Sequence, residues 1–325
     1  ITSRPSEISN IMNRYFAEVG PNLASNIPLT DKTVLDYLDE PVHNTFYFLP
    51  IVQKEIQDEI NSLSQNKSSG LYSCPVKLLK LGSLQISEPL SVIFNKSIQT
   101  GTYPHKLKIA KIIPIHKDGD ETDPGNYRPI SLLSIFNRIF EKLMYDRLVS
   151  FINKYGLLYN SQYGFREKHN AQHAIIDITY RIQKNIDQGL FTCGLFIDLK
   201  KAFDTVNHNI LLTKLSHFGI RGVIHDWFKS YLSNRKQTVS IDGSISDYEV
   251  TSCGVPQGSV LGPLLFLIYI NDISKSSSIL SFYLFADDTS LICEHKDLKK
   301  LEVIVNNELK NISEWLRTNR LSLNV

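Results

Sequence analysis

The stretch Ser281-Phe282-Tyr283-Leu284-Phe285-Ala286-Asp287-Asp288-Thr289-Ser290-Leu291-Ile292-Cys293 places two adjacent aspartates inside an otherwise apolar run. Both flanks are rich in β-forming residues, which predicts a strand, a tight turn and a second strand. Ionised carboxylates beside so much apolar surface need a positive partner, and two neighbouring carboxylates repel each other. A hard divalent cation is the simplest partner for them. Asp287 and Asp288 are therefore a candidate metal site.

Another carboxylate, Asp198, ends a second apolar strand, Gly194-Leu195-Phe196-Ile197-Asp198. If this strand lies beside the hairpin at 282–293, Asp198 and Asp287 converge. Two such carboxylates can hold a pair of Mg²⁺ ions, which activate an attacking hydroxyl and stabilise a leaving phosphate oxygen. The Gly/Pro-rich block at 254–263 leads into a helix, and such a loop lets a substrate approach the backbone closely.

The amino-acid composition is that of a globular protein and leaves the function open. The chain has 325 residues, 42% hydrophobic and 21% charged, with a net charge of +2, so charge neither demands nor excludes nucleic acid. Four lysines between 106 and 117 have no acid among them, which favours phosphate contact about as much as a solvated face. The four cysteines form no C-x-x-C pair. The longest apolar stretch, 260–270, is too short to span a bilayer, so no membrane partner is expected.

The pattern of apolar residues predicts helices interleaved with short strands, an α+β arrangement with helices packed on one face of a sheet. The expected helices cover 8–19, 51–63, 75–100 as one or two helices, 135–155 between a Ser134 cap and Gly156, 171–188, 209–218, 223–232, 263–271 and 301–316. The expected strands cover 109–115, 192–199, a hairpin of 236–241 with 248–253 around Asp242-Gly243, and the hairpin at 282–293.

These blocks, in this order, resemble the reverse transcriptases of non-LTR (LINE-type) retrotransposons, in particular jockey-like elements. The resemblance extends over most of the chain. Its blocks are Asn126-Tyr127-Arg128-Pro129, Gln162-Tyr163-Gly164-Phe165-Arg166, the strand ending on Asp198, Trp227-Phe228-Lys229-Ser230-Tyr231-Leu232, Val255-Pro256-Gln257-Gly258 and Phe285-Ala286-Asp287-Asp288. Each block alone is moderately specific, and six in the right order make coincidence very improbable.

The resemblance implies the fingers and palm of a right-hand polymerase, with a small antiparallel palm sheet packed on helices. Residues 1–50 would be an N-terminal extension and connector, 51–190 the fingers-rich part, and 191–325 the catalytic palm, truncated before the thumb. The chain begins at Ile1 and ends before the lysine expected in the next palm motif, so we expect a fragment of a longer polypeptide. The implied reaction is RNA-directed DNA synthesis, the transfer of deoxynucleotides to a primer 3′-hydroxyl, in target-primed reverse transcription.

The resemblance also implies roles for individual residues. The catalytic carboxylates would be Asp198, Asp287 and Asp288, and the metal ligands for two Mg²⁺ ions, or Mn²⁺ in their place, would be Asp198, Asp287 and the backbone carbonyl of Leu199. The nucleotide-binding set would be Arg128 and Lys117 at the triphosphate, Phe203 as the gate against a 2′-hydroxyl, Gln257 and Gly258. The nucleic-acid-binding set would be Lys106, Lys108, Lys111 and Arg166. Asp204 is better interpreted as a helix cap or ion-pair partner than as a ligand.

The expected partners are template RNA, a DNA primer, dNTPs, and the endonuclease and thumb of the same polyprotein, inside the cell as a ribonucleoprotein of nucleus and cytoplasm. A different class remains open: a truncated or decayed domain that binds RNA without turnover. The segment Leu71-Tyr72-Ser73-Cys74 favours this binding-only alternative, because relatives commonly carry an Asp at this place, soon after the glycine. A P-loop ATPase is improbable because the chain has no G-x-x-x-x-G-K-[ST]. An aspartic protease would need a second copy of the loop at Asp288-Thr289-Ser290, and the sequence has none.

Overall fold

A computed structural model describes residues 4–64, 70–71 and 74–324, so Tyr72 and Ser73 lie outside the described residues. The α-helices are α1 (Pro5–Ser25), α2 (Gln53–Ser62), α3 (Val76–Leu81), α4 (Ser83–Thr100), α5 (Ile135–Lys154), α6 (Ala171–Asp187), α7 (His208–His217), α8 (Gly222–Leu232), α9 (Leu261–Ile270) and α10 (Leu298–Thr318). The strands are β1 (Ile109–His116), β2 (Tyr127–Leu132), β3 (Phe191–Ile197), β4 (Arg235–Ile241), β5 (Ser244–Ile245), β6 (Glu249–Thr251), β7 (Ser281–Phe285) and β8 (Asp288–His295). Short 3₁₀ turns include η4 (Ala202–Asp204).

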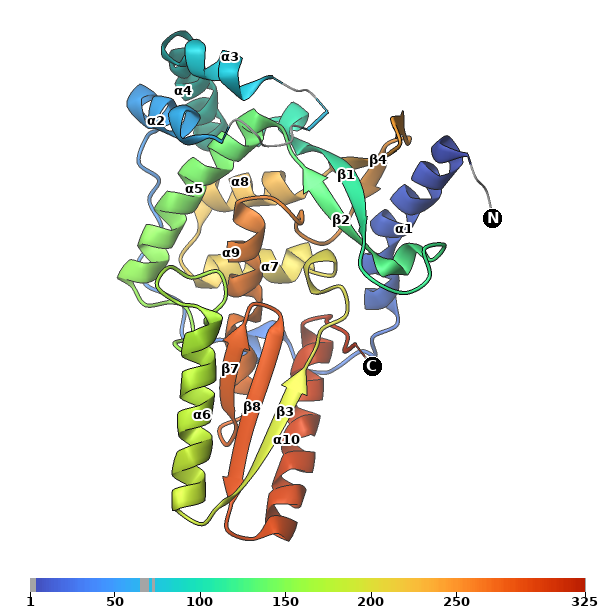
Figure 1. Cartoon of the computed structure of the whole chain (residues 1–325). Coiled ribbons are helices and arrows are strands. Elements are labelled where there is room, and N and C mark those ends of the chain that lie inside the picture. Colours follow the sequence, from blue (N-terminus) through green and yellow to red (C-terminus); the bar gives the residue numbers. More distant parts are fainter. Residues whose placement is uncertain (1–3, 65–69, 72–73, 325) are drawn as a thin grey trace.

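The smaller sheet has the order β3-β8-β7 and is antiparallel throughout. In Figure 1 it lies at the foot of the molecule between α6 and α10. Side chains alternate across a strand. Leu291 and Cys293 of β8 therefore join the main core on the side of α10, while Glu294 faces α6 and pairs with Arg181. This is the small antiparallel sheet that the sequence predicts.

The larger sheet is five-stranded and mixed. Its order is β2-β1-β4-β5, with β6 also on β4, and β1 runs parallel to β4. Helix α1 lies along this sheet in Figure 1 and forms a second small core, in which Met12 and Phe16 meet Ile112 and Val239. Strand pairing therefore crosses the boundary drawn at residue 190, and α1 packs across the one drawn at residue 50. Those boundaries stay predictions.

Helix α9 crosses the main core, and nine of its residues are buried, which suits a helix that is apolar on every side. Its start is fixed by Glu141 of α5, which is fully buried. The Glu141 carboxylate accepts hydrogen bonds from the Val260 amide at 2.6 Å and from the Tyr231 hydroxyl at 2.8 Å. The Gly/Pro-rich loop before α9 therefore ends at a rigid point.

Most expected elements are confirmed within a few residues. Ser134 caps α5, and Gly101 and Gly156 adopt positive φ just past the ends of their helices. Two details differ. Helix α1 continues through Gly20-Pro21. The predicted pairing of 236–241 with 248–253 is present as β4 with β6, but the turn at Asp242-Gly243 first joins β4 to the short β5, because the Ser246 hydroxyl accepts from the Val239 amide and interrupts the returning strand. In the described part of the chain, no helix has the length and apolar character of a membrane span.

Candidate active site

The two aspartates lie at the turn between β7 and β8, as predicted. Phe285 pairs with Asp288, so Ala286 and Asp287 form the turn, and Ala286 has a φ of 57°. The amide oxygen of Gln162 holds it in place by accepting from the Ala286 amide at 3.0 Å and from the Gly164 amide at 2.8 Å. A Cβ at Gly164 would lie 2.3 Å from the Ala286 nitrogen, so only glycine fits there.

Asp198 follows β3 beside this turn. Ile197 pairs with Thr289, which brings the next residue, Asp198, alongside Asp288. Asn324 binds Asp198 from the other edge of β3: its amide nitrogen donates to Oδ2 at 2.7 Å and its backbone N–H to the Asp198 carbonyl at 2.9 Å. Leu199 lies opposite Leu323 in this bridge, and the backbone hydrogen bonds of the bridge are made by the residues on either side of this pair. The Leu199 carbonyl therefore makes none of them.

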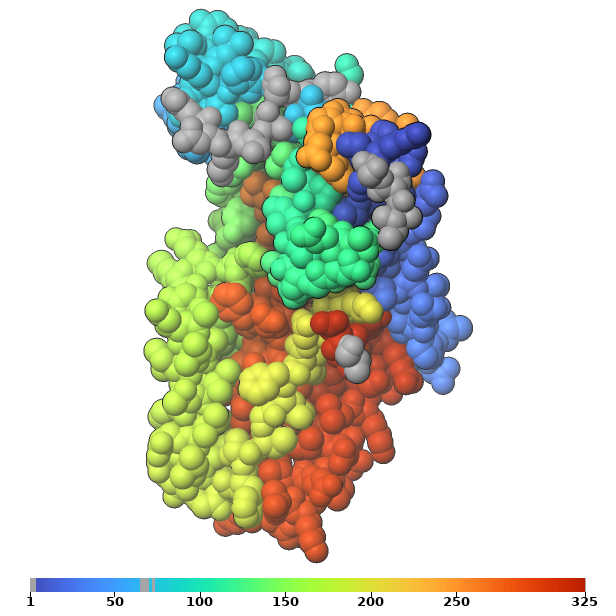
Figure 2. Space-filling model, turned by 45° about the vertical axis from the view of Figure 1, so that its right-hand side comes forward, coloured from blue at the N-terminus to red at the C-terminus, as the bar shows by residue number. Residues whose placement is uncertain are grey.

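A cleft of about 720 Å³ brings most of the predicted residues together. Asp198, Leu199, Phe203 and Asp287 line it from the smaller sheet and η4, and Lys117, Arg128 and Gln257 line it from the larger sheet and the Gly/Pro-rich loop. Figure 2 shows the green segment between β1 and β2 lying directly over the yellow segment after β3 and the red C-terminal residues. Carboxylates and cations thus face one cleft from two sides.

The charges in the cleft influence one another. Burial raises the pKa of Asp287, and the neighbouring carboxylates Asp288 and Asp198 raise it further, while Arg128 opposes them. Burial, Lys117 and Arg128 lower the pKa of Lys201. The Lys201 ammonium donates to the carbonyls of Gly125 and Tyr127 at 2.9 and 3.2 Å, which ties the turn after Asp198 to the β1–β2 segment.

The predicted nucleotide contacts lie side by side. The ring of Phe203 stacks on Phe266 with centroids 4.6 Å apart and remains part of the cleft wall. The Gln257 side chain is held by Asp204, which accepts from Nε2 at 2.8 and 2.9 Å. Asp204 therefore holds Gln257 and does not serve as the predicted helix cap. Gly258 has a φ of 117° and lies against β2, outside the cleft lining.

Two members of the predicted nucleic-acid set are used inside the protein. Lys108 is 3% exposed and donates to the Ser233 carbonyl at 3.2 Å, so it is not free to contact nucleic acid. Arg166 is half-buried and donates to the carbonyls of Tyr159 and Gln162 at 2.9 and 3.2 Å, which stabilises the loop that carries Gln162. Lys108 is the last residue before β1, where its side chain turns inward. Lys106 is exposed and Lys111 is partly exposed, so these two remain candidates.

The donor set fits a hard divalent cation. Within the described ranges, no three His, Cys, Asp or Glu side chains form a complete metal cage. Mg²⁺ rarely uses such a cage and instead takes one or two carboxylates together with substrate phosphates and water. Asp198 and Asp287 on one cleft wall match that need. Burial and, after it, the neighbouring carboxylates raise the pKa of Asp287, and a bound cation would stabilise its charged form.

A comparison with protein families decides the assignment. A family model described as "Reverse transcriptase (RNA-dependent DNA polymerase)" matches residues 115–325. The chain belongs to the reverse transcriptase family. It therefore has the expected α+β reverse transcriptase fold, in a family of nucleotidyltransferases that generally use divalent metal ions.

Three of the curated relatives of this reverse transcriptase come from mobile elements of Drosophila melanogaster. Over 89% of the chain, it is 31% identical to "Probable RNA-directed DNA polymerase from transposon BS" and 30% identical to the corresponding X-element protein. Over 90% of the chain, it is 28% identical to "RNA-directed DNA polymerase from mobile element jockey". It spans about a third of each relative's length. The resemblance to non-LTR, jockey-like elements is confirmed.

The sequence patterns did not identify the residues that position this reverse transcriptase site. Gln162, Lys201, Asp204 and Asn324 each hold a predicted residue or its neighbour through a single hydrogen-bonding side chain. Gln162 lies in a block quoted for another reason, and Asp204 follows directly after Phe203. No spacing rule connects them, because each meets its partner only after the chain has folded.

Proposed function

We propose that the protein carrying this chain is an RNA-directed DNA polymerase of a non-LTR retrotransposon and that this chain contains its nucleotidyl-transfer site. The observation that carries the proposal is the shared cleft, which Asp198 and Asp287 line opposite Arg128 and Lys117. Such a cleft suits a substrate that is anionic at one end and reacts next to a metal ion. The presence of all the implied catalytic side chains speaks against the binding-only alternative.

In this proposal each residue has one task. Asp198 and Asp287 hold two Mg²⁺ ions, or Mn²⁺ in their place, with the Leu199 carbonyl as a further ligand and Asp288 beside them. The ions would activate the primer 3′-hydroxyl and stabilise the departing pyrophosphate. The Arg128 guanidinium, with its fork of donors, and Lys117 hold the triphosphate. Phe203 packs under the sugar and excludes a 2′-hydroxyl, while Gln257 and Gly258 border the nucleotide. Lys106 and Lys111 contact the phosphates of the template or primer.

The wider setting belongs to the same proposal. The template would be the element's own RNA, and the primer would be nicked target DNA. The endonuclease and thumb would come from other parts of the same polyprotein. The protein would act inside the cell, as a ribonucleoprotein of nucleus and cytoplasm.

Primer extension tests the function. The full-length protein is given poly(rA)/oligo(dT), dTTP and Mg²⁺, and Asp198→Asn and Asp287→Asn are compared with Glu302→Gln, a matched change at an exposed site on α10. We expect extension by the wild type and Glu302→Gln, and loss of at least about a hundredfold in both aspartate variants. RNA retention in a gel shift without extension would instead favour a binding module. Unchanged extension by Asp287→Asn would refute the proposed site.

A further inference from the structure

Gln257 is held on its main chain by β2. Its carbonyl accepts from the Ser131 amide at 2.7 Å. The next residue, Gly258, has a φ of 117°, and a Cβ there would lie 2.7 Å from the Ser131 carbonyl oxygen. The backbone of the loop therefore leaves Gln257 little freedom except in its side chain.

Asp204 removes that remaining freedom. Gln257 Nε2 lies 2.8 Å from Oδ1 and 2.9 Å from Oδ2 of the Asp204 carboxylate. An ionised carboxylate only accepts hydrogen bonds, so the amide nitrogen must face Asp204 and Oε1 must be the atom turned away. Hydrogen bonds to a charged acceptor are also about twice as strong as neutral ones.

The seat of Asp204 is rigid. A Cβ at Gly20 of α1 would lie 2.3 Å from the Asp204 carbonyl oxygen, and one at Gly254 would lie 2.8 Å from it. The thiol of Cys253 donates to the same oxygen at 3.3 Å. Two glycines and a thiol thus let α1 and the Gly/Pro-rich loop close tightly around the η4 turn.

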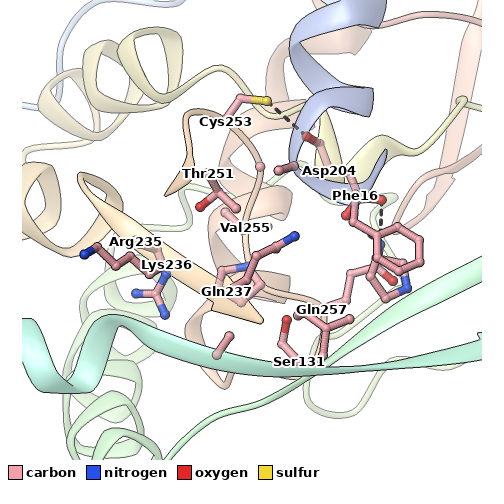
Figure 3. A pocket seen from close by; sticks show the side chains of 16 residues that line it. Phe16, Ser131, Asp204, Arg235, Lys236, Gln237, Thr251, Cys253, Val255 and Gln257 are labelled. Atoms are coloured by element: carbon pink, nitrogen blue, oxygen red, sulfur yellow. Dashed lines mark hydrogen bonds between the residues drawn. The ribbon is translucent and has the colours of Figure 1, made fainter. Parts of the chain in front are cut away.

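Asp204 acts from behind the cleft. It lines a separate cavity of about 50 Å³ between α1, β4 and the loop, shown in Figure 3 with Phe16, Cys253 and Gln257 around it. Asp204 does not line the 720 Å³ cleft, whereas Gln257 lines both spaces. A substrate in the cleft would therefore meet Gln257 and not Asp204.

We propose that Asp204 is a positioning residue for nucleotide binding: its carboxylate fixes the Gln257 amide so that Oε1 is offered as an acceptor to the incoming nucleotide. This inference rests on the proposed function. A hydroxyl of the nucleotide's sugar is a donor of the kind that such an oxygen recognises. Without Asp204 the amide can rotate or flip, and the nucleotide site loses a preorganised contact.

A double-mutant cycle tests the inference in the full-length protein, with dTTP on poly(rA)/oligo(dT). We expect Gln257→Ala and Asp204→Ala each to raise KM for dTTP about tenfold, while kcat and KM for the primer–template change far less. The double variant should match either single variant. Asp204→Asn should keep much of the raised KM, because its amide can donate to Oε1 as well as accept from Nε2 and so does not fix the Gln257 amide in one orientation. Glu302→Ala serves as the control for loss of a carboxylate elsewhere.

A pH profile decides the matter if Asp204→Ala does not fold. Burial raises the pKa of Asp204 to about 6, against the opposing effects of Gln257 and Lys201. Cys253 and Tyr15 are its other titratable neighbours, and burial raises the pKa of both. A protonated Asp204 can donate to Oε1 and let the amide flip. KM for dTTP should therefore rise below about pH 6 in the wild type and stay flat in Asp204→Asn.

The results distinguish failure of the inference about Asp204 from failure of the proposed function. The inference is overturned if Asp204→Ala leaves KM for dTTP unchanged, if its effect adds in full to that of Gln257→Ala, or if the two pH profiles are parallel. An unchanged KM in Gln257→Ala also overturns it. A wild-type protein that extends no primer overturns the proposed function, and the inference falls with it.

Discussion

The side-chain amide of Asn324 donates to Oδ2 of Asp198 at 2.7 Å, so the segment after α10 supports the carboxylate that ends β3. Two residues 126 positions apart thus form one unit at the cleft. Partners of this kind orient a metal ligand and raise its affinity.

Replacing Asn324 should therefore weaken metal binding and leave the chemistry intact. We expect Asn324→Ala to raise the Mg²⁺ concentration for half-maximal primer extension about tenfold, with near-normal rates at saturating Mg²⁺. Asn306→Ala, on the exposed face of α10, is the matched control. An unchanged Mg²⁺ titration would show that Asp198 needs no such partner.

Asp287→Asn should separate stability from activity. Burial and the charges of Asp288 and Asp198 oppose ionisation of Asp287, so removing its charge relieves repulsion in the metal-free protein. In EDTA we expect the variant to melt at the wild-type temperature or about 1–4 °C higher, although extension is lost. Mg²⁺ should then stabilise the wild type more than the variant. A lower melting temperature for Asp287→Asn in EDTA would contradict this.

Phe203→Ala should relax selection against ribonucleotides. The ring is supported by its stack on Phe266 and by an edge contact with Phe165, at centroid distances of 4.6 and 6.2 Å. We expect the ratio of kcat/KM for dTTP over UTP to fall about tenfold or more. Phe165→Ala removes the edge contact without changing the cleft wall and should keep the ratio. Equal ratios in Phe203→Ala and the wild type would refute the gate.

Asp204 should also give the protein a pH-dependent stability. Its pKa of about 6 lies above its ordinary value of 3.8, so the native state binds this proton more tightly than the unfolded state. The resulting stabilisation is complete below about pH 3.8 and is lost as pH rises to about 6. Between pH 4 and 6.5, Asp204→Asn should gain up to about 2–3 kcal/mol of unfolding free energy relative to wild type. Urea unfolding at a series of pH values measures this difference in unfolding free energy. Parallel profiles of stability against pH for Asp204→Asn and the wild type would contradict the prediction.

The lysines of the β1 region should behave differently from one another. Lys106→Ala should lower the slope of log affinity for RNA against log salt by about one, because an exposed phosphate contact is lost. Lys108→Ala should leave that slope unchanged and cost about 1–3 kcal/mol of stability, because the Ser233 carbonyl loses a buried donor. Gel shifts across a salt series, with melting curves, distinguish the two. Equal slopes for Lys106→Ala and the wild type would remove Lys106 from the interface.

Much of the site could be predicted because its signals are local. The 282–293 hairpin and the strand ending on Asp198 are short apolar runs, and a strand that ends on a carboxylate must expose it at the edge of a sheet. The Gly/Pro-rich loop before a buried helix is equally local. The convergence of Asp198 and Asp287 needed one further step, the pairing of β3 with β8, which the order of the blocks favoured.

The internal hydrogen bonds of Lys108 and Arg166 could not be predicted, for a related reason. A lysine or arginine looks the same in sequence whether it faces water or an internal carbonyl. Burial decides between them, and burial depends on elements far along the chain, such as the carbonyl of Ser233 for Lys108. The parallel pairing of β1 with β4 could not be predicted either, because the two strands lie more than a hundred residues apart in the sequence.

The sequence alone therefore determined the family, the antiparallel hairpin, the metal-binding carboxylates expected of it and the order of the helices, because periodicity and adjacent charges act over a few residues. Tertiary structure alone decided which side chains hold those carboxylates and the nucleotide loop in place. Gln162 on the Ala286 turn, Asn324 on Asp198 and Asp204 on Gln257 each depend on hydrogen bonds between residues far apart in the sequence. Such a contact forms only once the fold has brought both partners together, and no local pattern encodes it.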